Sequence, residues 1–325
     1  MEEKENLVGE NVEKVEEVQP VEESKYPHEG LQKVEDERKV FWKSYKLHNT
    51  IKTIVLFICM AAIITSFFVL PNVIPKEKSG LQLGLTITVA VVCLGGAYGY
   101  SVYVRRKFEG RMKEYFDLYF RSVNDYVFED KVFSDVELQV PGKITLDEFN
   151  ECKLYKDVFQ AGSRGLTTFK CKGIEASIVD CAGSVKAEKR VKPVFVGKMV
   201  RTKASYEGEE PVYIYLKGNE RSLPPTNLEE VKNVLEDQKK VVYSNYKDWK
   251  KVVNSGVIKA LDAMHTDKIL VDLAVSIYSG KAYIMMGYDD PLMVLPLQTK
   301  FDSKPTEIYK KDMEALAKLI EALNK

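Results

Sequence analysis

The sequence has few residues with which to bind a metal or carry out thiol chemistry. Only three of its 325 residues are histidine, and neither an H-E-x-x-H motif nor another paired spacing occurs. A zinc site needs several clustered nitrogen or sulfur ligands. The five cysteines include no C-x-x-C pair, which leaves a zinc ribbon or a thioredoxin-like site without support. We therefore predict no metal site, no cofactor and no catalytic residue.

The cysteines outside the apolar part of the chain are odd in number. Cys152, Cys171 and Cys181 cannot pair completely, which favours reduced thiols in the cytoplasm, and a Cys171–Cys181 bridge stays open as an alternative. Cys–His catalysis would require His265 to approach one of them. Because His265 follows a predicted helix, we interpret it as a capping or surface residue.

Motifs for nucleotide binding and for common hydrolases are also missing. The segment Gly162-Ser163-Arg164-Gly165 has neither the Walker lysine nor the G-x-G-x-x-G spacing, so we interpret it as a turn. No G-x-S-x-G elbow occurs. Asp289-Asp290 precedes Pro291 and is typical of a turn rather than of a general acid and base. We expect no nucleic-acid partner.

Charged residues are absent from two long apolar runs, Thr53–Leu70 and Leu81–Val104. As helices they would span roughly 27 and 36 Å, enough to cross a hydrocarbon core of about 30 Å. We predict an N-terminal two-helix transmembrane hairpin whose first span is an uncleaved anchor. Apart from the thiols of Cys59 and Cys93, the runs hold no ionisable side chain, which disfavours an ion or solute pathway.

Small residues in the second run predict close helix packing. Gly95 and Gly99 form a G-x-x-x-G pair that Gly96 extends, and glycines four apart lie on one helix face. We favour packing of the two spans of one chain, and dimerisation of two chains is the alternative.

The basic residues that flank the runs predict the orientation of the hairpin. The segment 38–52 carries five basic residues and no acidic one, and Arg105, Arg106 and Lys107 follow the second run, whereas the loop Pro71–Gly80 carries only Lys76 and Lys78 around Glu77. Because lysine and arginine are hard to translocate, both termini are expected in the cytoplasm of a multi-pass plasma-membrane protein.

Aromatic residues at the ends of the runs predict the level of the cytoplasmic interface. Amphipathic rings prefer the headgroup region, so we expect these residues to anchor it together with the three cations after the second run. They are Trp42, Tyr45, Tyr100 and Tyr103.

The rest of the chain predicts an acidic tail and one large globular domain. Residues 1–37 are acidic and poor in apolar side chains, which favours disorder. The expected parts are a disordered tail (1–37), a basic juxtamembrane segment (38–52), the two spans (53–70 and 81–104) with their external loop (71–80), and a cytoplasmic α+β domain (105–325). Apolar residues at helical spacing from Phe108 to Tyr126 predict that the second span continues as a stalk packed on this domain.

Alternation and turn residues predict the elements of the domain, a mixed or antiparallel sheet with flanking helices. Expected helices are Thr145–Tyr155, one capped by Thr226 or Asn227 through Leu235, one capped by Ser244 or Asn245 through Val253, then Ile258–His265 and Ile308–Leu323. Expected strands are Thr167–Cys181, Pro193–Thr202, Pro211–Lys217, Val241–Tyr243 and a hairpin that turns at Ser279–Gly280.

These elements resemble a known family. The stretches that carry the resemblance are the strand Val194–Met199, the segment Val242–Ser244 that leads into a helix at Tyr246–Val253, and the hairpin Leu270–Tyr288 before a terminal helix. Together with the paired spans, they resemble the domain-of-unknown-function family 3137 of bacterial membrane proteins. The resemblance implies N-terminal spans and a cytoplasmic domain, and it implies no activity.

These observations favour a membrane-anchored binding or scaffolding module over other functions. Its expected partners are membrane lipid and another membrane or membrane-proximal protein. One alternative is a membrane-bound enzyme of an unrecognised class. Another is a sensor of anionic lipid that would use Lys250 and Lys251, or Lys239 and Lys240, on predicted helix surfaces.

Overall fold

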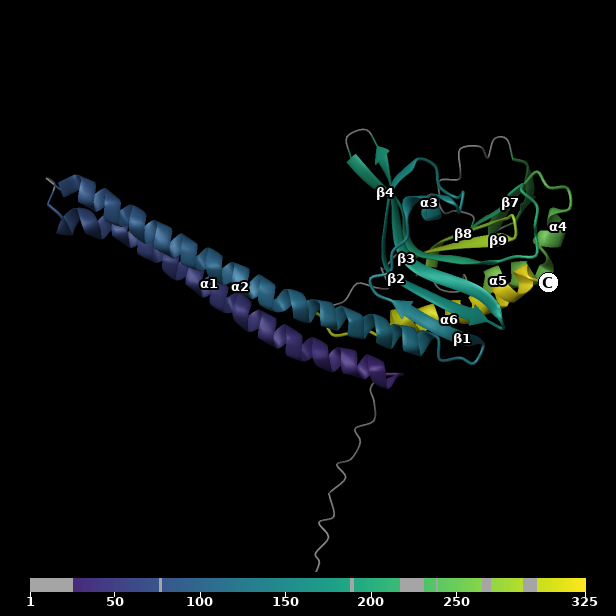
Figure 1. The fold of residues 1–325 in the computed structure, drawn as a ribbon, viewed down its shortest axis with the longest axis horizontal. Coiled ribbons are helices and arrows are strands. Elements are labelled where there is room, and N and C mark those ends of the chain that lie inside the picture. The colour runs from purple at the N-terminus through teal and green to yellow at the C-terminus, as the bar shows by residue number, and fades with distance from the viewer. Residues whose placement is uncertain are drawn as a thin grey trace, which may run out of the picture.

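The computed structural model shows a long helical hairpin attached to a sheet domain (Figure 1). It describes residues 26–75, 78–187, 190–216, 231–237, 239–264, 270–288 and 297–325. The elements in chain order are α1 (Glu29–Val73), α2 (Ser79–Val127), β1 (Phe133–Gln139), α3 (Leu146–Asn150), β2 (Val158–Cys171), β3 (Ile174–Ala187), β4 (Arg190–Lys203), β5 (Val212–Leu216), β6 (Asn233–Glu236), β7 (Lys240–Ser244), α4 (Trp249–Val252), α5 (Ser255–Met264), β8 (Leu270–Tyr278), β9 (Lys281–Tyr288) and α6 (Lys304–Leu323).

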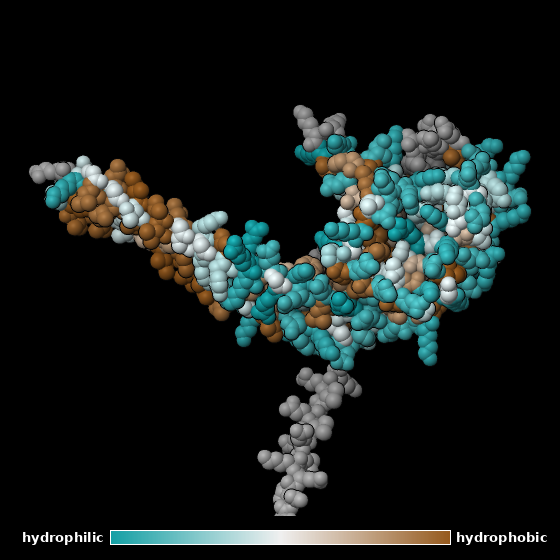
Figure 2. Space-filling model, viewed as in Figure 1, coloured by the Kyte–Doolittle hydropathy of each residue, from teal (hydrophilic) through white to brown (hydrophobic). Residues whose placement is uncertain are grey.

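The two long helices lie side by side and expose their apolar parts. Both are long and apolar enough to cross a membrane, and 0% and 11% of their most apolar windows are buried within the chain. A core helix of a soluble domain would bury such a stretch. Figure 2 shows the hydrophobic surface at the end of the hairpin far from the domain. The two helices are therefore candidate membrane spans, and their exposed apolar surface indicates membrane association.

Helix α2 continues without a break from its apolar half into the core of the domain. Its C-terminal half buries Phe108, Tyr115, Tyr119 and Val123, which recur at helical spacing. The predicted stalk from Phe108 to Tyr126 is confirmed. No flexible linker separates the apolar hairpin from the sheet.

Helix α1 begins earlier than the sequence predicts. It starts at Glu29, so residues 29–37, assigned to a disordered tail, are helical, and the helix passes Pro71 to end at Val73. The acidic composition of this segment favours disorder, but Leu31 and Val34 lie three residues apart on one helix face and are fully buried. These two apolar side chains attach the start of α1 to the core. Residues 1–25, the rest of the predicted tail, lie outside the described part of the chain.

The described strands form one antiparallel sheet in the order β1-β2-β3-β4-β9-β8-β5-β7-β6. The fold is α+β, as predicted. One face of the sheet packs on the end of α2 and on α5 and α6, where Val200, Ile284 and Leu316 are fully buried. The opposite face packs on Phe149 of α3, which is fully buried among Phe195, Met199 and other apolar residues.

Several predicted elements are present, although some bounds differ. The β8–β9 hairpin turns at Ser279–Gly280, where both residues have positive φ angles, and α6 is the predicted terminal helix. Thr145 caps α3 through a capping box with Glu148. The helix expected through Trp249 is short, and its N-cap is Asp248 rather than Ser244 or Asn245.

Other predictions are wrong. The expected strand Thr167–Cys181 is two strands, because the chain reverses at Lys172–Gly173 with positive φ angles. The segment Gly162–Gly165 lies within β2 and is not a turn. The helix expected through Leu235 is the strand β6, which pairs with β7. His265, Asp289 and Asp290 lie outside the described residues.

Candidate functional site

The predicted interface aromatics lie along the part of the hairpin where its apolar half ends, and we name this stretch the aromatic girdle. The rings of Trp42 and Tyr45 stack at 5.8 Å, and Tyr45 meets Phe108 of α2 edge-on at 5.4 Å. Tyr100 and Tyr103 lie 6.1 Å apart on α2. Tyr45 therefore lies level with Phe108, and Tyr103 lies five residues, about 7.5 Å, nearer the apolar end of α2. The role of these residues as interface anchors stays a prediction.

Basic residues border this girdle. Arg105, Arg106 and Lys107 are all exposed. The Lys107 ammonium lies 3.1 Å from His48 Nε2 and 5.8 Å from the ring centre of Tyr103. Because His48 belongs to α1, this contact joins the two helices beside the cationic rim, which Arg105, Arg106 and Lys107 form where the apolar surface ends.

The glycines of α2 do not pack against α1. A Cβ added at Gly95, Gly96 or Gly99 would meet no atom within 4 Å, so their open faces point away from the partner helix. The small residue that is buried here is Ala97, at 6% exposure. The two spans of one chain thus make no close backbone contact at these glycines, because such a contact would place α1 atoms within that distance. Packing of the glycines against a second chain, the alternative, stays a prediction.

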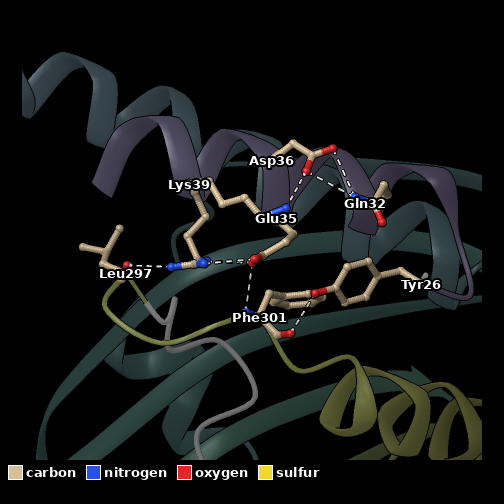
Figure 3. Close-up of polar contacts among 8 residues, drawn as sticks. Tyr26, Gln32, Glu35, Asp36, Lys39, Leu297 and Phe301 are labelled. Carbon is tan, nitrogen blue, oxygen red and sulfur yellow. Dashed lines mark hydrogen bonds and ion pairs between the residues drawn. The ribbon is translucent and has the colours of Figure 1, made fainter. Parts of the chain in front are cut away.

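A buried ion pair, which sequence reasoning missed, ties α1 to the domain. Glu35 and Arg38 are 2% and 7% exposed, and Arg38 donates to both carboxylate oxygens of Glu35 at 2.6 and 2.9 Å. Arg38 also donates to the carbonyl of Leu297, and the Phe301 N–H donates to Glu35 at 3.0 Å. Figure 3 shows these contacts, which we name the α1 clamp.

The clamp satisfies a buried carboxylate with directed donors. Burial opposes the ionisation of Glu35, but hydrogen bonds from Arg38 and from the Phe301 N–H outweigh it and lower the pKa of Glu35. The hydroxyl of Tyr26 extends the contact by donating to the Phe301 carbonyl. The clamp thus fixes the domain end of α1 to the segment that precedes α6.

The sheet carries an open polar depression of about 560 Å³, which we name the polar shelf. One row of its residues crosses five strands in register, and a second row lies beside it. The first row is Glu137, Thr168, Ser177, Arg201 and Tyr283. The second row is Lys170, Glu175, Lys203 and Lys281.

Ion pairs cover the polar shelf. Lys170 pairs with Asp135 at 2.7 Å, Lys203 with Glu175 at 2.8 Å, and Arg201 with Glu148 of α3 at 3.1 Å. These pairs are solvent-exposed or partly so, and exposed pairs contribute little to stability. They can therefore exchange partners at low cost, which suits a surface that binds charged polypeptide.

The tyrosine at the end of the shelf is a donor and not a base. Tyr283 donates to Glu151 at 2.9 Å. Burial, followed by this hydrogen bond, raises the pKa of Tyr283, so its hydroxyl keeps its proton at neutral pH.

A second polar cluster is enclosed and has no room for a ligand. Lys198, which is 3% exposed, pairs with Asp180 and lies 4.2 Å from the ring centre of Tyr309 on α6. Thr167 donates to Asn124 of α2 at 2.9 Å beside it. The adjoining cavity of about 20 Å³ is of the size of a water molecule. These contacts serve to hold α2 and α6 on the sheet.

The cysteines are placed unfavourably for nucleophilic chemistry. Cys152, Cys171 and Cys181 are free and buried, so the Cys171–Cys181 bridge is not formed. Burial raises the pKa of Cys152 to about 12 and also raises the pKa values of Cys171 and Cys181, which disfavours the reactive thiolate. Among the described residues, no group of three or more His, Cys, Asp and Glu side chains could hold a metal ion.

The predicted lysine pairs occupy different environments. Lys240 is buried at the start of β7 and pairs with Asp262 at 2.6 Å and with Asp237 at 3.3 Å, so its expected place on an exposed helix is wrong. Lys250 and Lys251 are exposed on α4. Figure 1 places α4 at the end of the domain away from the hairpin.

Comparisons with known proteins add little. No family model matches the chain, and no curated protein matches it. Among solved structures, the chain is similar to the crystal structure of the mycobacterial trehalose monomycolate transport factor A, TtfA, with 11% sequence identity and a TM-score of 0.35. The match covers 62% of this chain and 93% of that chain. A similarity at this level carries no argument about function.

Proposed function

We propose that the chain is a membrane-anchored cytoplasmic binding or scaffolding module. One observation carries the proposal. Helix α2 runs without interruption from an exposed apolar surface, through an aromatic girdle with a cationic rim, into the core of a sheet domain. The α1 clamp fixes α1, the other helix of the hairpin, to the same domain. Such a domain stands at a set height above the membrane and in a set orientation.

The charge pattern supports the cytoplasmic side for the domain. The exposed cations Arg105, Arg106 and Lys107 lie at the domain end of the hairpin, and the loop at its other end is poorer in basic residues. We propose that both termini lie in the cytoplasm and that the chain crosses the plasma membrane twice.

The polar shelf is the proposed binding surface. Its second row carries Lys170, Glu175, Lys203 and Lys281, its first row carries Glu137 and Arg201 at either side of neutral residues, and neighbouring strands lie about 4.8 Å apart. An extended polypeptide with charges of both signs can replace the existing ion pairs one for one. We propose a membrane or membrane-proximal protein as its source, because the anchored domain encounters such partners most often.

Photo-crosslinking in cells tests this surface. A photoreactive amino acid at Ser177, in the middle of the shelf, should give a discrete crosslinked product whose partner is identified by mass spectrometry. Lys259, exposed on α5, is the matched control position and should not give this product. Replacing Lys170 and Lys203 with alanine should remove the product because it removes two of the three exchangeable ion pairs.

The opposite results would exclude the shelf as the binding surface. They are the same products from positions 177 and 259, or a product that persists in the Lys170→Ala, Lys203→Ala variant.

A further inference from the structure

Outside the helical hairpin, the large apolar side chains that are clearly exposed in the described part of the chain gather at one place. All large hydrophobic residues of the described chain that are clearly exposed lie between Val40 and Tyr103, except Val191 and Val196, which are 59% and 47% exposed. Both belong to β4, near its turn from β3. We name the described residues 185–187 and 190–196 the β3–β4 arm.

The strand register places these two valines on one face of the arm. Lys186 pairs with Val191, Ser184 with Pro193, and Ala182 with Val196. Directly opposed residues of an antiparallel pair share a face, as do alternate residues of β3. A register shift between Gly183 and Ser184 adds one residue to β4, and this shift brings Val191 and Val196 to the same side.

The same arm is basic. Lys186, Arg190 and Lys192 are all exposed, and the sequence between the two described parts of the arm, Glu188-Lys189, adds no net charge. The ammonium of Lys186 lies over the ring of Phe159, 5.1 Å from the ring centre. The combination of exposed branched apolar side chains with a rim of cations is typical of a surface that enters the headgroup region of a bilayer.

The position of the arm agrees with this role. Figure 1 shows the arm projecting from the sheet on the side of the domain that faces the apolar half of the hairpin. Figure 2 shows hydrophobic surface on this projection. Helix α4 and the C-terminus lie at the opposite end. A bilayer that holds the hairpin would therefore lie nearer to the arm than to the rest of the sheet.

We propose that the β3–β4 arm is a second membrane contact, which binds the anionic headgroups of the leaflet that the hairpin enters. The contact rests on the proposed membrane anchoring. Because the hairpin already tethers the domain, even a weak contact is populated through its high effective concentration. Two points of attachment would set the rotation of the domain about α2, and thereby the direction in which the polar shelf faces.

Fluorescence quenching in nanodiscs tests the contact in the full-length chain. A fluorescent amino acid is placed at position 191, and the quencher is a lipid with a spin-labelled headgroup. For the fluorescent amino acid at position 92, which lies near the middle of the second apolar run, the quencher is a lipid spin-labelled at the end of its acyl chain. Position 92, exposed in the apolar half of α2, reports insertion of the hairpin, and position 259 on α5 is the distant control. The discs contain either equal parts of phosphatidylglycerol and phosphatidylcholine or phosphatidylcholine alone.

We expect position 92 to be quenched in both lipids, position 191 to be quenched mainly in the anionic discs, and position 259 to remain unquenched. Raising the salt from 0.1 to 1 M shortens the screening length from about 10 to about 3 Å and should reduce the signal at position 191. Quenching at 92 with no more quenching at 191 than at 259 overturns the contact and leaves the anchoring intact. No quenching at 92 overturns the anchoring itself.

Charge reversal locates the attraction on the arm. Changing Lys186, Arg190 and Lys192 to glutamate should lower the quenching at 191 to its level in phosphatidylcholine. The matched control changes Lys247, Lys250 and Lys251, three exposed lysines at α4, to glutamate and should leave the quenching unchanged. An equal loss of quenching at position 191 in both variants would assign the attraction to the net charge of the domain. That result would overturn the proposed membrane contact of the arm.

Discussion

At the scale of single residues, the α1 clamp pairs one residue of the acidic segment 1–37 with one residue of the basic segment 38–52. Glu35 belongs to an acidic stretch and Arg38 to a basic one, and each looks like a solvated charge. The structure buries both and pairs them with backbone groups more than 250 residues away. Helical spacing alone predicts that Glu35 and Arg38 can pair. It does not predict that the segment from Leu297 to Phe301 covers the pair, because that contact is distant in the sequence.

Removing one partner of the clamp should destabilise the domain end of α1. Glu35→Ala leaves the buried Arg38 without its carboxylate, and breaking a buried pair in this way typically costs about 3–5 kcal/mol. Chemical unfolding of the full-length chain in detergent measures the loss. Asp36→Ala is the matched control, since Asp36 is the neighbouring acid and its side chain is 57% exposed. Equal losses in both variants would contradict the clamp.

Acid should release the clamp. Because the pKa of Glu35 is lowered in the folded chain, its contribution to stability is complete above the unfolded value of about 4.3 and is lost as the pH falls through the lower folded value. Amide hydrogen exchange of residues 31–41 should therefore rise below about pH 4. The same residues of the Glu35→Gln variant should show no such step, and a step of equal size there would assign it to another group.

At the scale of elements, hydrophobic periodicity predicts helices better than it predicts strand ends. The long period from Phe108 to Tyr126 identified the stalk, and the alternation around Ser279–Gly280 identified the β8–β9 hairpin. The turn at Lys172–Gly173 was missed because Cys171 and Ile174 continue the apolar alternation across it. Segment 231–236 contains a strand where the sequence predicts a helix. Its pairing with β7 is a tertiary contact, and this contact overrides the local propensity of the segment.

The polar shelf was also missed at this scale. Each of its strands alternates between polar and apolar residues, and this pattern predicts one exposed face for each strand. The order of the strands decides which exposed faces adjoin, and β4 pairs with β9 across a long separation in sequence. The composition of the shelf could be predicted, whereas its assembly could not.

The unbroken course of α2 can be tested with two substitutions at one position. Gly110 is exposed, and a Cβ there would meet no atom within 4 Å. Gly110→Pro removes a helix hydrogen bond at a cost of about 3 kcal/mol and should kink the helix, whereas Gly110→Ala should stabilise it by up to about 1 kcal/mol. Spin labels at positions 92 and 259 should give a broadened distance distribution only in the proline variant. An unchanged distribution there would show that the domain is not positioned by α2.

At the scale of the whole molecule, the proposed topology has a direct measurement. A membrane-impermeant maleimide on intact cells should label Gly80→Cys, at the far end of the hairpin, and should label Lys250→Cys only after lysis. The parent chain sets the background, which should be low because Cys152, Cys171 and Cys181 are at most 5% exposed and Cys59 and Cys93 lie within the two apolar runs. Labelling of Lys250→Cys in intact cells would place the domain outside.

The rigid stalk also has a mechanical consequence. From Val104 to Val127, α2 extends about 35 Å as a helix, with no joint at the point where it leaves its apolar half. A thinner bilayer makes an embedded helix lean, and leans of about 20° are ordinary. Over that length, such a lean carries the sheet sideways by about 12 Å. A change in lipid thickness thereby becomes a displacement large enough to bring a neighbouring protein into reach or to take it away.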